Sequence, residues 1–193
     1  MNVNIPDNKL EQIVELCKKN NRKAQKDLYD LFSKKFFIIC LRYSTDYSEA
    51  EDMLQEGFIK LYAQINKFNK GGYFKSWAGR LIANNCIDMI RKKPNLYAIT
   101  DFHANSLETS TINALDKMIG DDVLNIIQSL PTGYRTIFNM YVIEGFSHKE
   151  IAERLNIKTG TSKSQLNRAK NLLQKKLKEI NNYDSLQLSN LHK

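Results

Sequence analysis

Residues that break helices are scarce in this chain, which has 8 glycines and 3 prolines among its 193 residues. Its apolar residues recur mostly at helical spacing, so we expect a predominantly helical protein. No apolar run approaches the roughly 18 residues that indicate a membrane span. The first residues, MNVNIPDNKLEQ, lack the basic and then apolar order of a secretory signal. We therefore expect a cytoplasmic protein without membrane insertion.

Cysteine is also scarce, and the spacing of the cysteines argues against two kinds of site. Cys17, Cys40 and Cys86 are far apart, whereas metal sites use closely spaced ligands. Their odd number argues against a disulfide framework. Each lies in an apolar stretch, which predicts buried free thiols in a reducing cytosol.

The chain lacks the residues that an enzyme acting on nucleic acid would need. It has no metal-binding constellation and no phosphate-binding loop, and its three histidines are scattered, at His103, His148 and His192. We therefore expect no catalytic residues, no metal, no cofactor and no small-molecule substrate.

Acidic residues are outnumbered by basic ones, which gives the chain a formal net charge of +8. A basic balance suggests a polyanionic partner, with a membrane surface as the weaker alternative. Plain solubility is the simplest explanation of the charge taken alone. Hydrophobic residues make up 42% of the chain and charged residues 26%, which is typical of a soluble protein that buries a core.

Helical patterns occupy the first half of the chain. We expect helices near Leu10–Lys19, over Lys23–Ser44, from Ser48 to about Ile65, and over Phe74–Lys93. Ser48 followed three residues later by Glu51 predicts a capping box at the start of the third helix. Gly57 inside that helix costs about 1 kcal/mol relative to alanine, so we expect a close approach at this position.

A segment of different composition begins at Pro94. From Pro94 to Asp122 there are five acids against one base, and serine, threonine and asparagine are frequent. This composition is typical of an extended or partly disordered linker. Helical patterns resume at DDVLNIIQSLP and GYRTIFNMYVIEG, and a frayed tail is expected after about Ile180. We therefore expect an all-α chain with a first domain at 10–93, an acidic linker at 94–120, a second domain at 121–178 and a polar tail at 179–193.

The stretch GFSHKEIAERLNIKTGTSKSQLNRAK, Gly145–Lys170, predicts two short helices joined by a polar turn. Ser147 and Glu150 form a capping box for the first helix, and the small Ala152 allows a second helix to cross closely. Asn156 occupies the position where a tight turn would follow. Asparagine is among the few residues other than glycine that tolerate the left-handed backbone region.

The second helix of this pair, expected to begin near Thr159, is strongly basic. Between Lys158 and Lys178 there are seven bases and no acids. The inward face is expected to hold Leu166, Ala169, Leu172, Leu173 and Leu177. The outward surface is expected to hold Lys163, Ser164, Asn167, Arg168 and Lys170. Such a helix fits a major groove, where its side chains bond phosphates and base edges. The simpler alternative is a solvated basic face on a helical hairpin.

Two surfaces of the first domain are candidates for partners. Asp52, Gln55 and Glu56 lie on neighbouring turns of one helix, as either a solvated face or a face that docks a protein. The stretch FNKGGYFKSWAGR interleaves aromatic and basic residues, which can form a stacking platform for unpaired nucleotides. The alternative is core packing, which we favour for Phe74 and Trp77. Phe68 is expected to be more open.

Three separated motifs resemble bacterial sigma factors of the extracytoplasmic-function group, in the sigma-70 family. They are AEDMLQEGFIKLY, then F..W...LIANNCID.IRKK, then LP..YR.IFNMY.IEGFSHKEIAERLNIKTGTSKSQLNRAK. They match regions 2 and 4 of that group in the right order, over roughly Lys23–Leu177, with the acidic linker between them. The resemblance implies a helical region 2 bundle and a region 4 helix-turn-helix. It also implies a protein without catalytic activity that binds core RNA polymerase, directs it to promoter DNA and helps to open the duplex.

The resemblance implies roles for particular residues. The clamp helices of the polymerase's large subunit would meet Asp52, Gln55 and Glu56. A flipped base and nearby phosphates of the −10 element would be held by Phe68, Asn69, Lys70, Gly71, Gly72, Asn85 and Lys92. The −35 element would be read in the major groove by Thr161, Lys163, Ser164, Asn167, Arg168 and Lys170. Members of the group are commonly held by an anti-sigma factor, which would be a separate partner chain.

The chain departs from the family pattern at several positions. These are Ser162 where valine is common, Gln165 where arginine is common, Asn84 where a base is common and Gly57 where threonine is common. The departures leave the fold intact, but a relative's promoter preference does not carry over to this chain.

The main alternative is a transcriptional regulator that binds duplex DNA alone, as a dimer, through the same helix-turn-helix. A regulator of that kind needs a receiver or ligand-sensing domain. The N-terminal half shows no alternation of strands and helices and no obvious ligand pocket, so the sigma factor is the favoured hypothesis.

Overall fold

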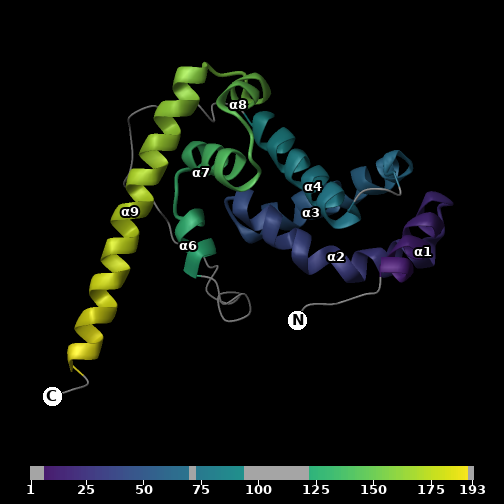
Figure 1. The fold of residues 1–193 in the computed structure, drawn as a ribbon, viewed down its shortest axis with the longest axis horizontal. Coiled ribbons are helices and arrows are strands. Elements are labelled where there is room, and N and C mark those ends of the chain that lie inside the picture. The colour runs from purple at the N-terminus through teal and green to yellow at the C-terminus, as the bar shows by residue number, and fades with distance from the viewer. Residues whose placement is uncertain (1–6, 70–72, 94–121, 191–193) are drawn as a thin grey trace. The chain divides into compact units, whose positions relative to one another are not determined.

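The computed structural model describes the backbone of residues 7–69, 73–93 and 122–190. Every regular element in these ranges is helical, which confirms the all-α prediction. The predicted linker at 94–120 lies outside the described residues. The chain divides into two compact units, Met1–Lys92 and Lys93–Lys193 (Figure 1).

Unit 1, Met1–Lys92, is a helical bundle built around its second helix. Its elements are α1 (Asp7–Lys18), α2 (Arg22–Tyr43), α3 (Tyr47–Gln64), the 3-10 turn η1 (Ile65–Lys67) and α4 (Phe74–Arg91). Helix α2 packs against α1, α3 and α4, and α3 also packs against α4. The core between them holds side chains that are almost fully buried, among them Leu28, Phe36, Leu61 and Ile87.

All three cysteines are free and buried in unit 1, as predicted. Cys40 on α2 and Cys86 on α4 face each other with their Sγ atoms 3.9 Å apart. Burial raises the pKa of the Cys17 thiol to about 11. The hydrogen bond with Cys40, followed by burial, raises the pKa of the Cys86 thiol. Because the thiolate is the reactive form, Cys17 and Cys86 are inert thiols at neutral pH.

The start of α3 differs from the sequence prediction, and the capping box expected from Ser48 and Glu51 is wrong. The N-cap is Asp46, whose Oδ1 accepts the backbone N–H of Glu49 at 2.8 Å. Glu49 Oε2 in turn accepts the backbone N–H of Thr45 at 2.8 Å and the Thr45 hydroxyl at 2.6 Å. Aspartate ranks with serine as an N-cap, so the earlier aspartate begins the helix.

The close approach expected at Gly57 is present between α3 and α4. A Cβ at Gly57 would lie 2.6 Å from Ile82 Cδ1, well inside the distance of carbon atoms in contact. Beside this contact, Asn85 of α4 donates from Nδ2 to the backbone oxygen of Met53 at 3.1 Å. Met53 lies four residues before Gly57, so its carbonyl is also the helical acceptor for the Gly57 N–H. The missing side chain therefore leaves room for Ile82 of α4, whereas Asn85 Nδ2 would lie at an ordinary 3.7 Å from the same Cβ.

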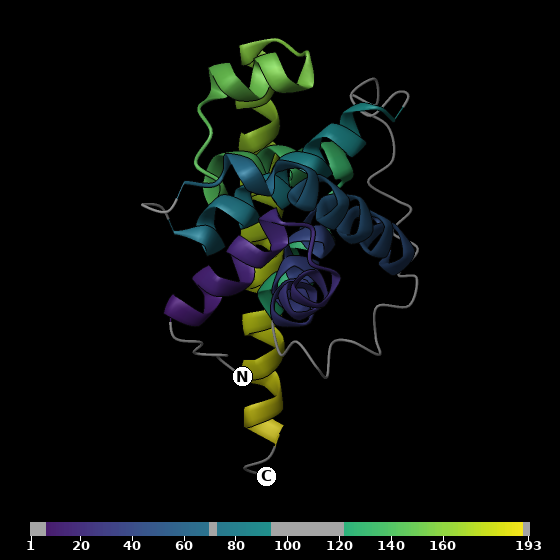
Figure 2. The same ribbon diagram turned by 90° about the vertical axis from the view of Figure 1, so that its right-hand side faces the viewer.

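Unit 2, Lys93–Lys193, consists of short helices packed on one long helix. Its described elements are α6 (Asp122–Gln128), α7 (Thr132–Phe138), the π-helical turn η2 (Asn139–Ile143), α8 (His148–Leu155) and α9 (Thr159–Asn190). Helices α6, α7 and α8 all pack against α9, which is continuous in both views (Figures 1 and 2). The core of this unit includes Leu130, Ala169 and Leu173.

Two helix ends in unit 2 differ from the prediction. The helix expected over GYRTIFNMYVIEG ends in a π turn, where the N–H of Glu144 donates to the oxygen of Asn139 at 3.0 Å. The tail expected to fray after about Ile180 is helical as far as Asn190. Leu177, expected to face inward, is 45% exposed. Helix α9 itself extends beyond the short helices that are packed on it (Figure 1).

The contact at Gly57 predicts that the effect of Gly57→Ala on stability depends on the side chain at position 82. Gly57→Ala gains about 1 kcal/mol of helix propensity, but overpacking against Ile82 costs about 1–3 kcal/mol. We expect a net destabilisation of unit 1, measured as the free energy of unfolding in a denaturant titration. In an Ile82→Val background the obstructing methyl is absent, so Gly57→Ala should there be neutral or stabilising.

Gly79 provides the matched control, because it is a helical glycine on α4 with ordinary space. A Cβ at Gly79 would lie 3.6 Å from Ile39 Cδ1, a normal contact distance. Gly79→Ala should therefore raise the free energy of unfolding by up to about 1 kcal/mol. Equal effects of the two glycine substitutions would contradict the close approach at Gly57.

Candidate nucleic-acid and protein interfaces

The α8–α9 hairpin begins and turns as the sequence predicted. The capping box at α8 is present: the N–H of Ser147 donates to Glu150 Oε2 at 2.8 Å, and the N–H of Glu150 donates to Ser147 Oγ at 3.3 Å. Asn156 ends α8 in the left-handed region, with φ 53° and ψ 49°. This conformation turns the chain sharply, so that α9 begins at Thr159 and crosses α8 closely.

The inward face of α9 includes two polar residues that the sequence analysis did not place there. Leu166, Ala169 and Leu173 are buried, as expected. Ser162 and Gln165 are also buried, at 0% and 6% exposure. These are two of the positions at which the chain departs from the family pattern. Because they face the interior, they bear on how α9 packs and offer no surface to a DNA groove.

The outward face of α9 carries the residues predicted to read DNA. Thr161 is half-buried. The others are exposed, and they are Lys163, Ser164, Asn167, Arg168 and Lys170. Ser164 Oγ donates to the backbone oxygen of Thr161 at 3.0 Å. Arg168 Nη1 lies 3.4 Å from the Tyr134 hydroxyl of α7. The face therefore offers ammonium, guanidinium, hydroxyl and amide groups, which can bond both phosphates and base edges.

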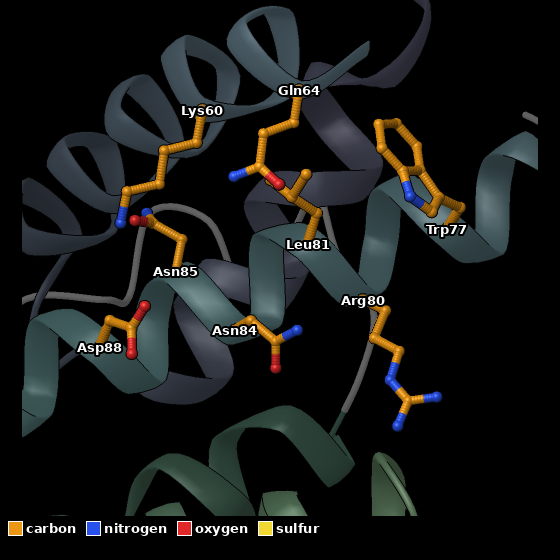
Figure 3. Close-up of a pocket in the computed structure, with 8 residues that line it drawn as sticks. All are labelled: Lys60, Gln64, Trp77, Arg80, Leu81, Asn84, Asn85 and Asp88. Carbon is orange, nitrogen blue, oxygen red and sulfur yellow. The ribbon is translucent and has the colours of Figure 1, made fainter. Parts of the chain in front are cut away.

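A pocket of about 260 Å³ lies between α3 and α4 in unit 1. Figure 3 shows the residues that line it, which are Lys60 and Gln64 on α3 and Trp77, Arg80, Leu81, Asn84, Asn85 and Asp88 on α4. Its volume is near the small end of ligand pockets, which run from about 300 to 1,000 Å³. Two bases and one acid line it, together with amide groups and an indole. Such a lining suits a planar polar group attached to an anion.

Asn85 occupies an unusual position in the wall of this pocket. Its side chain points from α4 toward α3 (Figure 3), and the residue is only 1% exposed. Nδ2 donates to the backbone oxygen of Met53, while Oδ1 is buried and has no hydrogen-bond partner among the described residues. A buried acceptor without a donor is costly, so this oxygen is a ready partner for a donor that enters the pocket.

The aromatic residues after η1 form a packed cluster. Phe68 meets Phe74 edge-to-face with ring centroids 5.2 Å apart, and it meets Trp77 at 5.3 Å. Phe68 is 8% exposed, so the expectation that it is open to solvent is wrong. Phe74 is buried, in agreement with the core packing favoured for it. Trp77 is half-buried and also lines the pocket. Lys18 Nζ donates to the backbone oxygen of Phe68 at 3.1 Å, which ties this segment to α1.

Two other residues predicted to contact the −10 element are described. Asn69 and Lys92 are both exposed. Lys70, Gly71 and Gly72, which were predicted to complete the loop, lie outside the described residues. The described part of the predicted group therefore consists of one buried ring, one buried amide and two exposed polar side chains.

The polar face of α3 is exposed as a candidate docking surface. Asp52 and Gln55 are exposed and Glu56 is half-buried. The same face holds Ile59, which the sequence analysis missed and which is 62% exposed. Helical spacing could have predicted this, because Ile59 follows Gln55 by four residues and Asp52 by seven, which places all three on one helix face. An exposed isoleucine among acidic and amide groups is a natural anchor for a protein partner.

Candidate metal sites and membrane-spanning helices are both absent from the described residues. No group of three or more histidine, cysteine, aspartate or glutamate side chains there could hold a metal ion. None of the helices in that part of the chain is both long and apolar enough to span a bilayer.

The geometry of Asn85 predicts a structural penalty for its removal. Asn85→Ala deletes the hydrogen bond to the Met53 carbonyl and empties space beside Gly57, so unit 1 should lose about 1–3 kcal/mol of stability. Ser76→Ala, at an exposed position near the start of the same helix, should lose much less. The measurement is the free energy of unfolding of both variants. If the two substitutions cost the same, the Asn85–Met53 bond does not stabilise the α3–α4 contact.

Two solved structures show a weak overall similarity to the chain. One is a chain from the structure of CnrH in complex with the cytosolic domain of CnrY, at 17% identity and a TM-score of 0.47, covering 86% of this chain and 96% of that one. The other is from the co-crystal structure of the sigma factor RpoE with the anti-sigma factor NepR from Bartonella quintana, at 22% identity and a TM-score of 0.44, covering 79% and 96%. At these TM-scores the similarity carries no argument about this chain.

The sequence similarities are stronger. The chain matches the family model of sigma-70 region 2 over residues 28–94 and that of sigma-70 region 4 over residues 120–173. It is 32% identical over 187 residues to the ECF RNA polymerase sigma factor SigW of Bacillus subtilis, covering 89% of this chain and 98% of that protein. It is 24% identical over 182 residues to the ECF RNA polymerase sigma-E factor of Haemophilus influenzae, covering 88% and 96%. The chain therefore belongs to the extracytoplasmic-function group of sigma-70 family RNA polymerase sigma factors.

Proposed function

We propose that this chain binds core RNA polymerase, directs it to promoters and helps to open the duplex, without catalysing a reaction itself. One observation supports this most directly: region 2 and region 4 of the sigma-70 family both match within one chain, in that order. We place this activity in the cytoplasm. The partners are core polymerase, promoter DNA and, as is common in the group, an anti-sigma factor that holds the chain inactive.

The −35 element is assigned to the outward face of α9. Lys163 and Asn167 are exposed one turn apart, so both can enter the same groove. Asparagine bonds adenine edges, and lysine bonds guanine edges or phosphates. The acid-free surface around them adds the salt-dependent attraction of phosphate neutralisation.

The −10 element is assigned to the pocket between α3 and α4. A base flipped out of the duplex is a planar polar group attached to an anion, which matches the lining of this pocket. Asn85 Oδ1 would accept from the amino group of the base, while Lys60 and Arg80 would attract its phosphates. The ring of Phe68 is packed on Phe74 and on Trp77, so it would support the pocket wall at Trp77.

Polymerase docking is assigned to the exposed side of α3. Asp52, Gln55 and Glu56 supply polar contacts, and Ile59 supplies apolar surface in their midst. A groove of about 300 Å³ between α2 and α3 continues this surface and includes Tyr29, Phe37 and Tyr47 in its wall. Exposed aromatic and aliphatic groups beside charges are typical of protein interfaces.

A helix-turn-helix regulator that acts without polymerase is the second candidate. It is disfavoured because the region 2 match covers the half of the chain where a sensing domain would lie. The discriminating experiment mixes the purified chain with core polymerase and a promoter library and maps transcript starts. Duplex binding by the chain alone, with no initiation under any condition, would establish the regulator in place of the sigma factor.

The division of roles between the two units predicts separable defects. Lys163→Ala with Asn167→Ala should weaken use of promoters that have a −35 element by at least about fivefold, since each good base contact that is lost is worth about 1–3 kcal/mol. Polymerase binding by this variant should be unchanged. Ile59→Ser should show the reverse pattern, with weaker polymerase binding at every promoter.

Both defects are measured in one assay, as transcript yield against chain concentration, with polymerase binding followed separately by fluorescence anisotropy. Lys178→Ala is the matched control, because Lys178 is an exposed lysine farther along α9. A loss of polymerase binding in the Lys163/Asn167 variant equal to its loss of promoter use would refute the division of roles.

A further inference from the structure

One imidazole joins three elements at the base of the helix-turn-helix. His148 is the first residue of α8, and its Nδ1 lies 2.9 Å from Ser162 Oγ in the first turn of α9. Its ring stacks on Tyr141 of η2, with centroids 4.4 Å apart and an interplanar angle of 24°. Neither the sequence motifs nor the proposed function assigns a role to His148.

The bond to Ser162 determines which edge of the ring is available. Ser162 is fully buried, and a buried hydroxyl needs a partner, which His148 supplies. Valine, common at this position in the family, could make no such bond. Because Nδ1 points at a buried atom, Nε2 lies on the opposite edge of a half-buried ring. In the protonated ring Nδ1–H donates to Ser162, and Nε2–H remains as a second donor.

The charges around the ring are those of the proposed DNA surface. Burial, and then the ammonium groups of Lys163 and Lys170 on α9, lower the pKa of His148. From η2 the ring meets the phenol of Tyr141. On α8 itself, Lys149 is exposed, while Glu150 is engaged in the capping box. The imidazole thus lies beside two of the cations that are assigned to phosphate and base contacts.

We propose that His148 is a proton-dependent phosphate ligand at the edge of the recognition surface, donating from Nε2 to a DNA phosphate while Ser162 holds Nδ1. This inference rests on the proposed function of the α9 surface. The two ammonium groups of Lys163 and Lys170 disfavour the protonated ring of His148. A phosphate bound between the three side chains is an anion, so it favours the protonated ring and offsets that effect. Binding of promoter DNA is therefore coupled to uptake of one proton.

The sign of the pH effect follows from this coupling. In the free protein the pKa of His148 is lowered, so the ring is mostly neutral at pH 7. In the complex the phosphate raises the pKa of the same ring. The affinity for DNA should rise as the pH falls through the pKa of the complex, and it should level off below the pKa of the free protein. One coupled proton changes the affinity by at most about tenfold per pH unit.

The experiment measures promoter binding by reconstituted polymerase between pH 8 and pH 6, with the wild-type chain or His148→Gln. Comparing the two cancels the titration of groups in polymerase. The ratio of wild-type to variant affinity should grow by about three- to tenfold over this range. His192→Gln is the matched control and should follow the wild type. Parallel profiles for the wild type and His148→Gln would overturn the proposal.

Two further measurements test the two parts of the proposal, which are the Ser162 bond and the rise in the pKa of His148 on DNA binding. Ser162→Val restores the residue common in the family and frees the ring, so most of the pH-dependent gain should disappear while binding at pH 8 persists. Retention of the full pH dependence in Ser162→Val would overturn the role of the Ser162 bond. Nuclear magnetic resonance of the full chain should show the pKa of His148 rising when a short promoter duplex is added.

Folding of each variant is checked by circular dichroism and thermal unfolding at both ends of the pH range. If wild-type chain gives no promoter binding at any pH, the proposed function itself fails, and this inference fails with it. If binding occurs but the pKa of His148 does not move on addition of the duplex, only the present inference fails.

Discussion

The contact of α3 with α4 at Gly57 is the constraint on which the candidate sites of unit 1 depend. Because Gly57 has no Cβ, Ile82 packs closely on α3. Beside this contact, Asn85 donates to the Met53 carbonyl at 3.1 Å. These contacts fix how far apart the two helices lie, and therefore how wide the pocket between them is. They also leave the opposite side of α3, with Asp52, facing solvent. The proposed base pocket and the proposed polymerase surface thus share one rigid support.

Unit 2 relies on a backbone conformation and a buried polar bond in a similar way. The left-handed Asn156 turns the chain between α8 and α9, and the bond of Ser162 to His148 joins the first turns of the two helices. Leu166 and Ala169 then pack the hairpin from inside. In both units a small residue or an amide near the backbone sets the distance between helices. The exposed side chains that meet partners are carried on elements positioned in this way.

Features of the candidate sites that depend on neighbouring residues could be predicted from the sequence, whereas distant contacts could not. The capping box of Ser147 and Glu150 and the turn at Asn156 involve residues close together in the chain, and both are present. The box expected at Ser48 failed because Asp46 competes for the same helix start. Phe68 was expected to be open, but its neighbours Phe74 and Trp77 come from beyond the loop. The local sequence pattern does not predict that the ring of Phe68 will pack against these two rings.

The sequence alone determined the all-α class, the family and the residues that form the outward face of α9. Helical spacing and local turn chemistry depend on residues within a few positions of each other, so they can be predicted from the sequence. Tertiary structure alone decided that Asn85 faces α3 and that Ser162 is buried against His148. It also decided that Ile59 is exposed among acidic neighbours. Burial and hydrogen bonding of this kind arise between segments far apart in sequence, and their geometry exists only when the helices have packed.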